Sequence, residues 1–192
     1  MLGQDRRIKQ GSVSIPASID FVLKSVEDQY HSSLAELSHS TPILLVFLRQ
    51  FGCCFCREAL SDMHFSLANI EAAGAKLVLV HMSEEEEASQ ILASYGLADI
   101  SRISNSDQSL YKSFGLGRGS LDMVFSPRVL GRAIEALLHG NPIGKSCGDG
   151  LQMPGVFLLH RGRVLQTYVP ESVDSRPDYV RIVSNATAYA AV

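Results

Sequence analysis

The alternation of apolar runs and helical stripes divides the chain into strands and helices. Ile43 to Leu48 is an unbroken apolar run that follows Pro42, and Ala75 to Met82 is a second such run with β-branched residues. Runs of this length are typical of strands that are buried on both faces. Between the two runs, side chains at helical spacing continue until Gly74: Leu60, Met63, His64, Leu67 and Ile70. The order strand, helix, strand predicts a parallel pair joined by a right-handed crossover.

The N-terminal part and the segment after the second strand carry weaker signals. Residues 1–15 are polar and irregular, and we expect a flexible N-terminal extension there. Apolar residues at helical spacing from about Ala17 to Leu37 predict one amphipathic helix or two short ones. Ser83 and Glu86 have the spacing of a capping box, so a helix is expected from there to about Tyr95.

The remaining elements follow from turn and helix-start signals. A short strand is expected from Ile100 to Ser104, and a short helix capped by Asp107 or Ser106 follows it. Proline at a first helical position predicts further helices from Pro127 to about His139 and from Pro177 to about Ala190. A hairpin is expected between them, with strands Gly155–His160 and Val164–Val169 and with Pro154 at the first strand position. The pattern predicts one α/β domain over residues 1–192, with a central sheet flanked by helices.

Composition and charge narrow the classes of function. The net charge of −3 offers no electrostatic footprint for nucleic acid or anionic lipid. No segment approaches the roughly 18 consecutive apolar residues of a membrane-spanning helix, and no apolar run follows the basic N-terminus. We therefore expect a cytoplasmic protein with no nucleic-acid or membrane partner. Three of the four cysteines lie between positions 53 and 56, which in a reducing compartment suggests catalysis or metal binding.

A Cys-x-x-Cys sequence stands where the first apolar strand passes into a helix. Unpaired N–H groups and the positive end of the helix dipole stabilise a thiolate at such a helix start, as on a thioredoxin-like fold. Cys53 is therefore the candidate nucleophile, and Cys56, one turn later, is placed to attack an oxidised Cys53. Cys54 is expected to point elsewhere, and Cys147 is either a free loop cysteine or an alternative resolving thiol. His64 and His81 lie on apolar runs and are expected in the core.

Several stretches together resemble one family. The segments RQFGCCFCREAL, SLYKSFGLGRGS and GDGLQMPGVFLLHRGRV, followed by SRPDY, are similar to the peroxiredoxin-like branch of the alkyl hydroperoxide reductase and thiol-specific antioxidant superfamily. That branch includes selenoprotein-L-like proteins and relatives of prostamide/prostaglandin F synthase. The resemblance covers roughly residues 41–190. It implies a thioredoxin-like fold with a central mixed sheet and a helical insertion before a hairpin that begins at a cis proline.

The resemblance assigns roles to particular residues. It makes Cys53 the peroxidatic or attacking thiol and Cys56 its resolving partner. It also implies that the Met153–Pro154 bond is cis and that this loop binds the substrate; the alternative is a trans proline that merely begins a strand. Typical peroxiredoxins have Pro and Thr or Ser seven and three residues before the attacking cysteine, whereas this chain has Val46 and Gln50.

Two arginines are candidates for the missing cationic donor. Arg49 and Arg57 each lie four residues from Cys53, and either can stabilise a thiolate and polarise a peroxide oxygen, unless it is simply solvated. The leading hypothesis is a peroxiredoxin-like thiol oxidoreductase that reduces a peroxide and is itself reduced by an external dithiol donor such as thioredoxin. A thioredoxin-like disulfide reductase is the alternative.

Two other classes of function remain open. Cys53, Cys54 and Cys56 with Cys147 or a histidine form a zinc-binding alternative, and a redox-inactive interaction domain is the other. No organic cofactor is expected, because the glycines of Gly115–Gly119 lack both the spacing of a dinucleotide fingerprint and a preceding strand.

Overall fold

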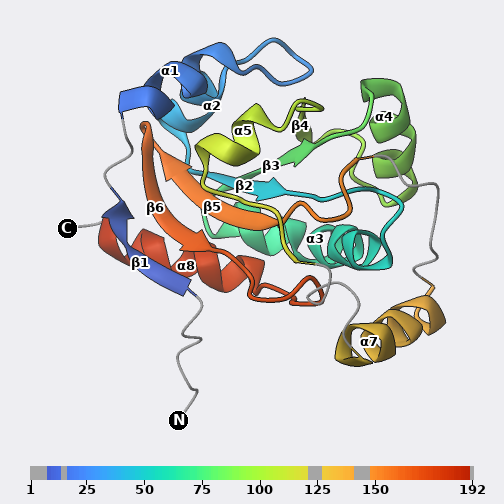
Figure 1. Ribbon diagram of the computed structural model, residues 1–192. Coiled ribbons are helices and arrows are strands. Elements are labelled where there is room, and N and C mark those ends of the chain that lie inside the picture. Colours follow the sequence, from blue (N-terminus) through green and yellow to red (C-terminus); the bar gives the residue numbers. More distant parts are fainter. Residues whose placement is uncertain (1–7, 14–16, 121–126, 141–147, 191–192) are drawn as a thin grey trace.

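A six-stranded mixed sheet with helices on both faces forms the body of the computed structural model (Figure 1). The structure describes residues 8–13, 17–120, 127–140 and 148–190. The strand order is β1-β6-β5-β2-β3-β4. The strands are β1 (Ile8–Val13), β2 (Ile43–Phe47), β3 (Lys76–His81), β4 (Ser101–Ser104), β5 (Gly155–His160) and β6 (Arg163–Tyr168). The helices are α1 (Ala17–Ser25), α2 (Leu34–Ser40), α3 (Cys54–Ala72), α4 (Glu85–Ser94), α5 (Ser109–Ser113), α7 (Pro127–Leu138) and α8 (Tyr179–Ala190).

The register around β2 determines what lies near the end of that strand. β2 pairs parallel to β3 and antiparallel to β5. Phe47, the last residue of β2, lies opposite Gly155, the first residue of β5. The loop that follows β2 and the segment that precedes β5 therefore lie side by side at the same end of the central strands. About 100 residues separate them in the sequence.

The apolar run of β2 contributes to two hydrophobic clusters, one on each face of the sheet. Leu44 and Val46 join the cluster that includes residues of α3, α4 and α8. Ile43, Leu45 and Phe47 join the cluster that includes residues of α1, α2 and α5. Because alternate side chains of a strand point to opposite faces, an uninterrupted apolar strand is what a sheet covered on both sides requires. In Figure 1, α1, α2 and α5 lie above the sheet, whereas α3 and α8 lie below it.

Most predicted elements are confirmed, including the parallel strand pair, the hairpin and the helix that begins at Pro127. The N-terminal prediction was wrong in part, because Ile8–Val13 forms an edge strand on β6. The segment from Ala17 to Leu37 forms two helices. The last helix begins at Tyr179, where Asp178 accepts a hydrogen bond from the Arg181 N–H, two residues beyond the predicted start.

The predicted capping box at Ser83 was also wrong. Helix α4 begins at Glu85 with Glu84 as its N-cap residue and no side-chain cap. The Ser83 carbonyl accepts a hydrogen bond from Ser104 Oγ and lies 3.1 Å from His81 Nδ1, so Ser83 contacts the ends of β3 and β4. The capping box lies instead at α2, where Ser33 and Glu36 exchange the two expected hydrogen bonds. Asp107 accepts a hydrogen bond from the first N–H of α5, as expected, although Gln108 occupies the N-cap position. No helix among the described residues is long and apolar enough to cross a membrane.

Candidate active site

Cys53 occupies the N-cap position of α3. Its backbone is extended (φ −81°, ψ 130°), and its carbonyl accepts the first helical hydrogen bond from the Arg57 N–H at 3.1 Å. Its side chain is partly exposed, whereas those of Cys54 and Cys56 are buried. The three thiols are free. The positive end of the helix dipole therefore lies at Cys53, the most accessible of the three.

Arg49 connects the end of β2 to the Cys53 sulfur. Its Nη2 donates a hydrogen bond to Cys53 Sγ at 2.7 Å, and its Nη1 donates one to the Gly150 carbonyl at 3.0 Å. The residue is only 3% exposed. A buried guanidinium is costly unless it is paired, so a negative charge on Cys53 is the natural partner of this cation.

The neighbours of Cys53 favour its thiolate form. Hydrogen bonds from the Cys54 and Cys56 thiols, followed by the positive charge of Arg49, lower the pKa of Cys53 against the opposing effect of burial. The same hydrogen bonds, together with burial, raise the pKa of the Cys54 and Cys56 thiols. These shifts favour an ionised Cys53 beside protonated Cys54 and Cys56 thiols. Cys54, expected to point elsewhere, is buried, and its thiol is among the neighbours that lower the pKa of Cys53.

The other predicted site residues are Arg57, Met153 and Pro154. Arg57 donates from Nε to the Phe51 carbonyl at 2.9 Å, so its charge supports the loop before α3. Met153 and Pro154 directly precede β5, and Pro154 lines a pocket together with Arg49 and Cys56. Cys147 lies outside the described residues.

The expectation of a cis Met153–Pro154 bond was wrong, since the described residues contain no cis peptide bond. The Met153 N–H donates to the Gly117 carbonyl, and the Met153 carbonyl accepts from the Gln152 side chain. These contacts hold the backbone on the path that enters β5 directly. Pro154 lies just before that strand, at a position where the backbone need not donate a hydrogen bond to the neighbouring strand.

An apolar pocket lies beside Arg49 and Cys56, whereas Cys53 is not among its lining residues. It encloses about 460 Å³, part of it open to solvent. Its walls come from β2, from the first turns of α3 and from the segment between β6 and α8. Four aromatic residues and three prolines are among the lining residues: Phe47, Phe55, Tyr168, Tyr179, Pro154, Pro170 and Pro177. Arg49 and Cys56 supply polar groups at the wall, so a bound molecule would have an apolar part near the reactive centre.

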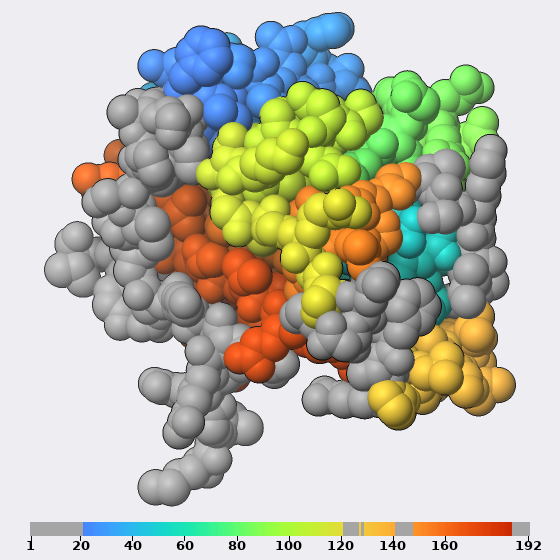
Figure 2. Space-filling model, viewed as in Figure 1, coloured from blue at the N-terminus to red at the C-terminus, as the bar shows by residue number. Residues whose placement is uncertain are grey.

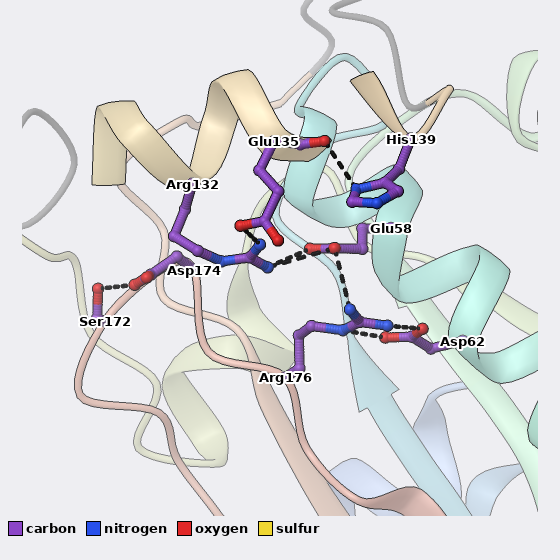
Figure 3. A network of polar contacts seen from close by, with 8 residues as sticks. All are labelled: Glu58, Asp62, Arg132, Glu135, His139, Ser172, Asp174 and Arg176. Carbon is purple, nitrogen blue, oxygen red and sulfur yellow. Dashed lines mark hydrogen bonds and ion pairs between the residues drawn. The ribbon is translucent and has the colours of Figure 1, made fainter. Parts of the chain in front are cut away.

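A network of ion pairs holds α7 and the segment before α8 onto α3 just beyond the redox pair (Figure 3). Glu58 is 5% exposed and contacts Arg132 at 3.1 Å and Arg176 at 3.2 Å. Arg176 also pairs with Asp62, and Arg132 with Glu135. Because a buried carboxylate must be paired, Glu58 fixes two otherwise distant segments against the helix that carries Cys56.

His81 lies in the core as predicted, whereas His64 is exposed. The His81 ring packs on Phe51 with a centroid separation of 5.4 Å, and its Nδ1 lies 3.1 Å from the Ser83 carbonyl. Burial lowers the pKa of His81 from 6.5 to about 4, although the Glu85 carboxylate opposes this shift.

The buried His81 makes stability depend on pH. Between pH 6.5 and 4 the unfolded chain binds a proton that the folded chain excludes, so stability decreases as the pH falls through this range. The full contribution is about 3 kcal/mol. Urea unfolding at a series of pH values should show a shallower decrease in His81→Gln than in the natural chain. The matched variant of the exposed histidine, His64→Gln, should keep the natural slope; equal slopes in all three proteins would contradict the assignment.

The described residues contain no group of three or more His, Cys, Asp or Glu side chains arranged to hold a metal ion. Two groups of the site were not predicted from the sequence: the Gly150 carbonyl, which contacts Arg49, and the Cys54 thiol, which lies next to Cys53. The two glycines that flank Asp149 were the available signal for Gly150, because they permit the close approach of a backbone.

Known proteins resemble this chain in sequence and in fold. No family model matches it. The prostamide/prostaglandin F synthase of Salmo salar is 30% identical over 166 residues, which cover 83% of this chain and 79% of that protein.

Three solved structures illustrate the likeness in fold. Bacterioferritin comigratory protein of Xanthomonas campestris has a TM-score of 0.63 at 15% identity, covering 94% of this chain and 99% of its own. Peroxidoxin BcpB of Mycobacterium tuberculosis has a TM-score of 0.55 at 18% identity, covering 83% and 90%. A putative thiol:disulfide interchange protein DsbE of Chlorobium tepidum has a TM-score of 0.53 at 18% identity, covering 86% and 90%. With its redox-type cysteine pair on this fold, the chain belongs to the peroxiredoxin-like, thioredoxin-fold family of thiol oxidoreductases that includes prostamide/prostaglandin F synthase.

Proposed function

We propose that the chain reduces peroxides through Cys53 and Cys56. The observation that carries this proposal is the 2.7 Å contact between Arg49 Nη2 and Cys53 Sγ at the start of α3. A cation and a helix N-terminus together stabilise the thiolate, which is the reactive form of a cysteine. The same guanidinium is placed to donate to a peroxide oxygen that approaches the sulfur.

The first step oxidises Cys53. The thiolate sulfur attacks one oxygen of a hydroperoxide, the O–O bond breaks, and the sulfur retains that oxygen as a sulfenic acid. The leaving alkoxide takes a proton from solvent and departs as an alcohol, or as water when the substrate is hydrogen peroxide. The two electrons that reduce the peroxide come from the sulfur.

The second step uses the buried thiol of Cys56. Its sulfur loses a proton and attacks the Cys53 sulfur, an S–S bond forms, and the sulfenic oxygen leaves as water. A helix start with two intervening residues permits such a bond with little backbone movement. An external dithiol donor, itself oxidised to a disulfide, then returns both cysteines to thiols.

The apolar pocket supports a substrate with an apolar group. Its wall contains Cys56 and Arg49 among aromatic and proline side chains. The name of the Salmo salar relative refers to prostaglandin and prostamide products, and a peroxide on an apolar skeleton fits this lining. We therefore propose organic peroxides as better substrates than hydrogen peroxide.

Disulfide reduction is the second candidate. Val46 and Gln50 stand where typical peroxiredoxins have Pro and Thr or Ser, so the usual peroxide pocket is missing. The same thiolate can instead attack a disulfide sulfur, form a mixed disulfide and be released when Cys56 attacks.

Stopped-flow oxidation of the reduced protein tests both candidates, with thiols counted before and after. Hydrogen peroxide, an apolar organic hydroperoxide and a small disulfide are compared. Loss of two thiols with the peroxides, fastest with the apolar one, supports the proposal. In Cys56→Ser the reaction should stop at a Cys53 sulfenic acid, which a sulfenic-acid-specific probe labels. Oxidation by the disulfide alone would favour the second candidate and contradict the first.

A further inference from the structure

The position of the Arg49 guanidinium depends on a backbone carbonyl from a distant loop. Its Nη1 donates to the Gly150 carbonyl while its Nη2 donates to Cys53. Two anchors at opposite nitrogens determine the plane of a guanidinium, whereas one anchor leaves it free to rotate. Whatever holds the Gly150 carbonyl in place therefore also holds the cation on the sulfur.

The loop that contains Gly150 follows the backbone of the active-site segment closely. A Cβ atom on Gly148 would lie 2.9 Å from the Arg49 carbonyl oxygen, and φ at Gly148 is +113°. A Cβ atom on Gly150 would lie 3.3 Å from Gln50 Nε2. Glycine is thus required at Gly148 for both space and conformation, but it leaves this stretch of backbone with little intrinsic stiffness.

The stiffness comes from contacts between two loops, which we call the clasp: residues 116–119 and residues 149–153. The backbones pair through the Gly119 N–H on the Leu151 carbonyl at 2.7 Å and the Met153 N–H on the Gly117 carbonyl at 3.0 Å. The buried Gln152 amide donates to the Leu116 carbonyl at 2.9 Å. In the space-filling view, the yellow segment that ends near residue 120 lies against the orange segment that begins at 148 (Figure 2).

Asp149 joins the two sides of the clasp next to Gly150. Its Oδ2 lies 2.8 Å from Arg118 Nε, and its Oδ1 accepts a hydrogen bond from the Leu151 N–H at 2.9 Å. One carboxylate thus fixes the residue after Gly150 and ties the turn to the opposite loop. The Asp149 side chain is 18% exposed and that of Arg118 is 62% exposed, so water partly screens the electrostatic attraction of this pair.

We propose that Asp149, together with Arg118, is a positioning residue that directs the Gly150 carbonyl toward Arg49 and so keeps the guanidinium on Cys53. This inference rests on the proposed function, in which Arg49 stabilises the Cys53 thiolate. It assigns a redox role to the GDG and GLGRG stretches, which lie about 30 residues apart in the sequence. Neither Asp149 nor Arg118 touches the sulfur.

The sign of the effect separates positioning from direct electrostatics. Removal of a negative charge near Cys53 would by itself favour the thiolate and lower the pKa of Cys53. Loss of the Arg49 anchor would instead remove a cation from the sulfur and raise that pKa. Asp149→Ala therefore gives opposite results under the two mechanisms.

The test measures the pKa of Cys53 from the pH dependence of alkylation of the reduced full chain by iodoacetamide, with mass spectrometry to locate the modified cysteine. We expect Asp149→Ala to raise the pKa of Cys53 by about one unit. At pH values below the pKa, this shift lowers the fraction of Cys53 that is ionised roughly tenfold. Asp149→Asn, which keeps the bond from the Leu151 N–H, should show a smaller shift. Glu135→Ala is the matched control, because it also removes a carboxylate paired with an arginine but lies on α7.

The double variant Arg49→Met/Asp149→Ala completes the experiment. If Asp149 acts through Arg49, the double variant should have the same pKa of Cys53 as Arg49→Met alone. An unchanged or lowered pKa in Asp149→Ala, with a raised one in Arg49→Met, would overturn the positioning role and leave the proposed function intact. An unchanged pKa in Arg49→Met would overturn the activation of Cys53 by Arg49, and the inference with it.

Discussion

Cys53→Ser should abolish thiol loss with peroxides and with disulfides, to below roughly one thousandth of the natural rate. A serine hydroxyl at the start of α3 keeps the size of the side chain but is not ionised near neutral pH, and neither Arg49 nor the helix dipole can make it a comparable nucleophile. The measurement is the stopped-flow assay described above, at matched concentrations of oxidant.

Cys54→Ser is the matched control for this prediction. It changes the adjacent residue in the same way, and its hydroxyl can still donate a hydrogen bond to Cys53. We expect this variant to lose two thiols per chain, as the natural protein does, with only a modest change in rate. If Cys53→Ser were as reactive as Cys54→Ser, the attacking role would belong to another cysteine. If neither the natural chain nor any variant reacted, the chain would be the redox-inactive interaction domain.

Much of the fold could be predicted because its signals are local. The unbroken apolar run of β2 and the helical spacing of apolar residues in α3 can each be recognised within about 20 residues. The strand and the helix both form as expected. The edge strand β1 pairs with β6 through backbone hydrogen bonds, which almost any sequence can supply, so the polar N-terminal segment carried no comparable signal. The sequence motif of a capping box occurs at both Ser33 and Ser83, and the contacts of the Ser83 carbonyl with Ser104 Oγ and His81 Nδ1 distinguish the second site from the first.

The candidate site was predictable only in part, for a similar reason. The strand-to-helix junction indicates Cys53 and Cys56 without reference to any distant residue. Arg49 and Arg57 are equivalent in spacing, and only the path of the chain places the first at the sulfur and the second at the Phe51 carbonyl. The Gly150 carbonyl reaches Arg49 across 101 residues, and no local pattern encodes that contact.

The other large effect is expected from Arg49→Met, which keeps much of the side-chain volume but removes the cation from Cys53. The pKa of Cys53 should rise by about one to three units, because an opposite charge in contact with an ionisable group shifts its pKa by that amount. Thiolate reactions should therefore slow most at pH values below the new pKa. The difference from the natural chain should narrow at higher pH, where Cys53 is ionised in both proteins. The pH profile of iodoacetamide alkylation and the stopped-flow peroxide rate measure this directly.

Two further arginine variants decide whether the effect belongs to this guanidinium. Arg49→Lys keeps the charge, but one ammonium cannot span both the Gly150 carbonyl and Cys53 Sγ with the geometry of a planar fork, so an intermediate pKa is expected. Arg57→Met removes an equal charge at the same distance in sequence, yet its contact is with the Phe51 carbonyl, so the pKa of Cys53 should stay near its natural value. A larger shift in Arg57→Met than in Arg49→Met would transfer the activating role to Arg57. Equal, small shifts in both would mean that the helix N-terminus and the neighbouring thiols hold Cys53 as a thiolate without help from either cation.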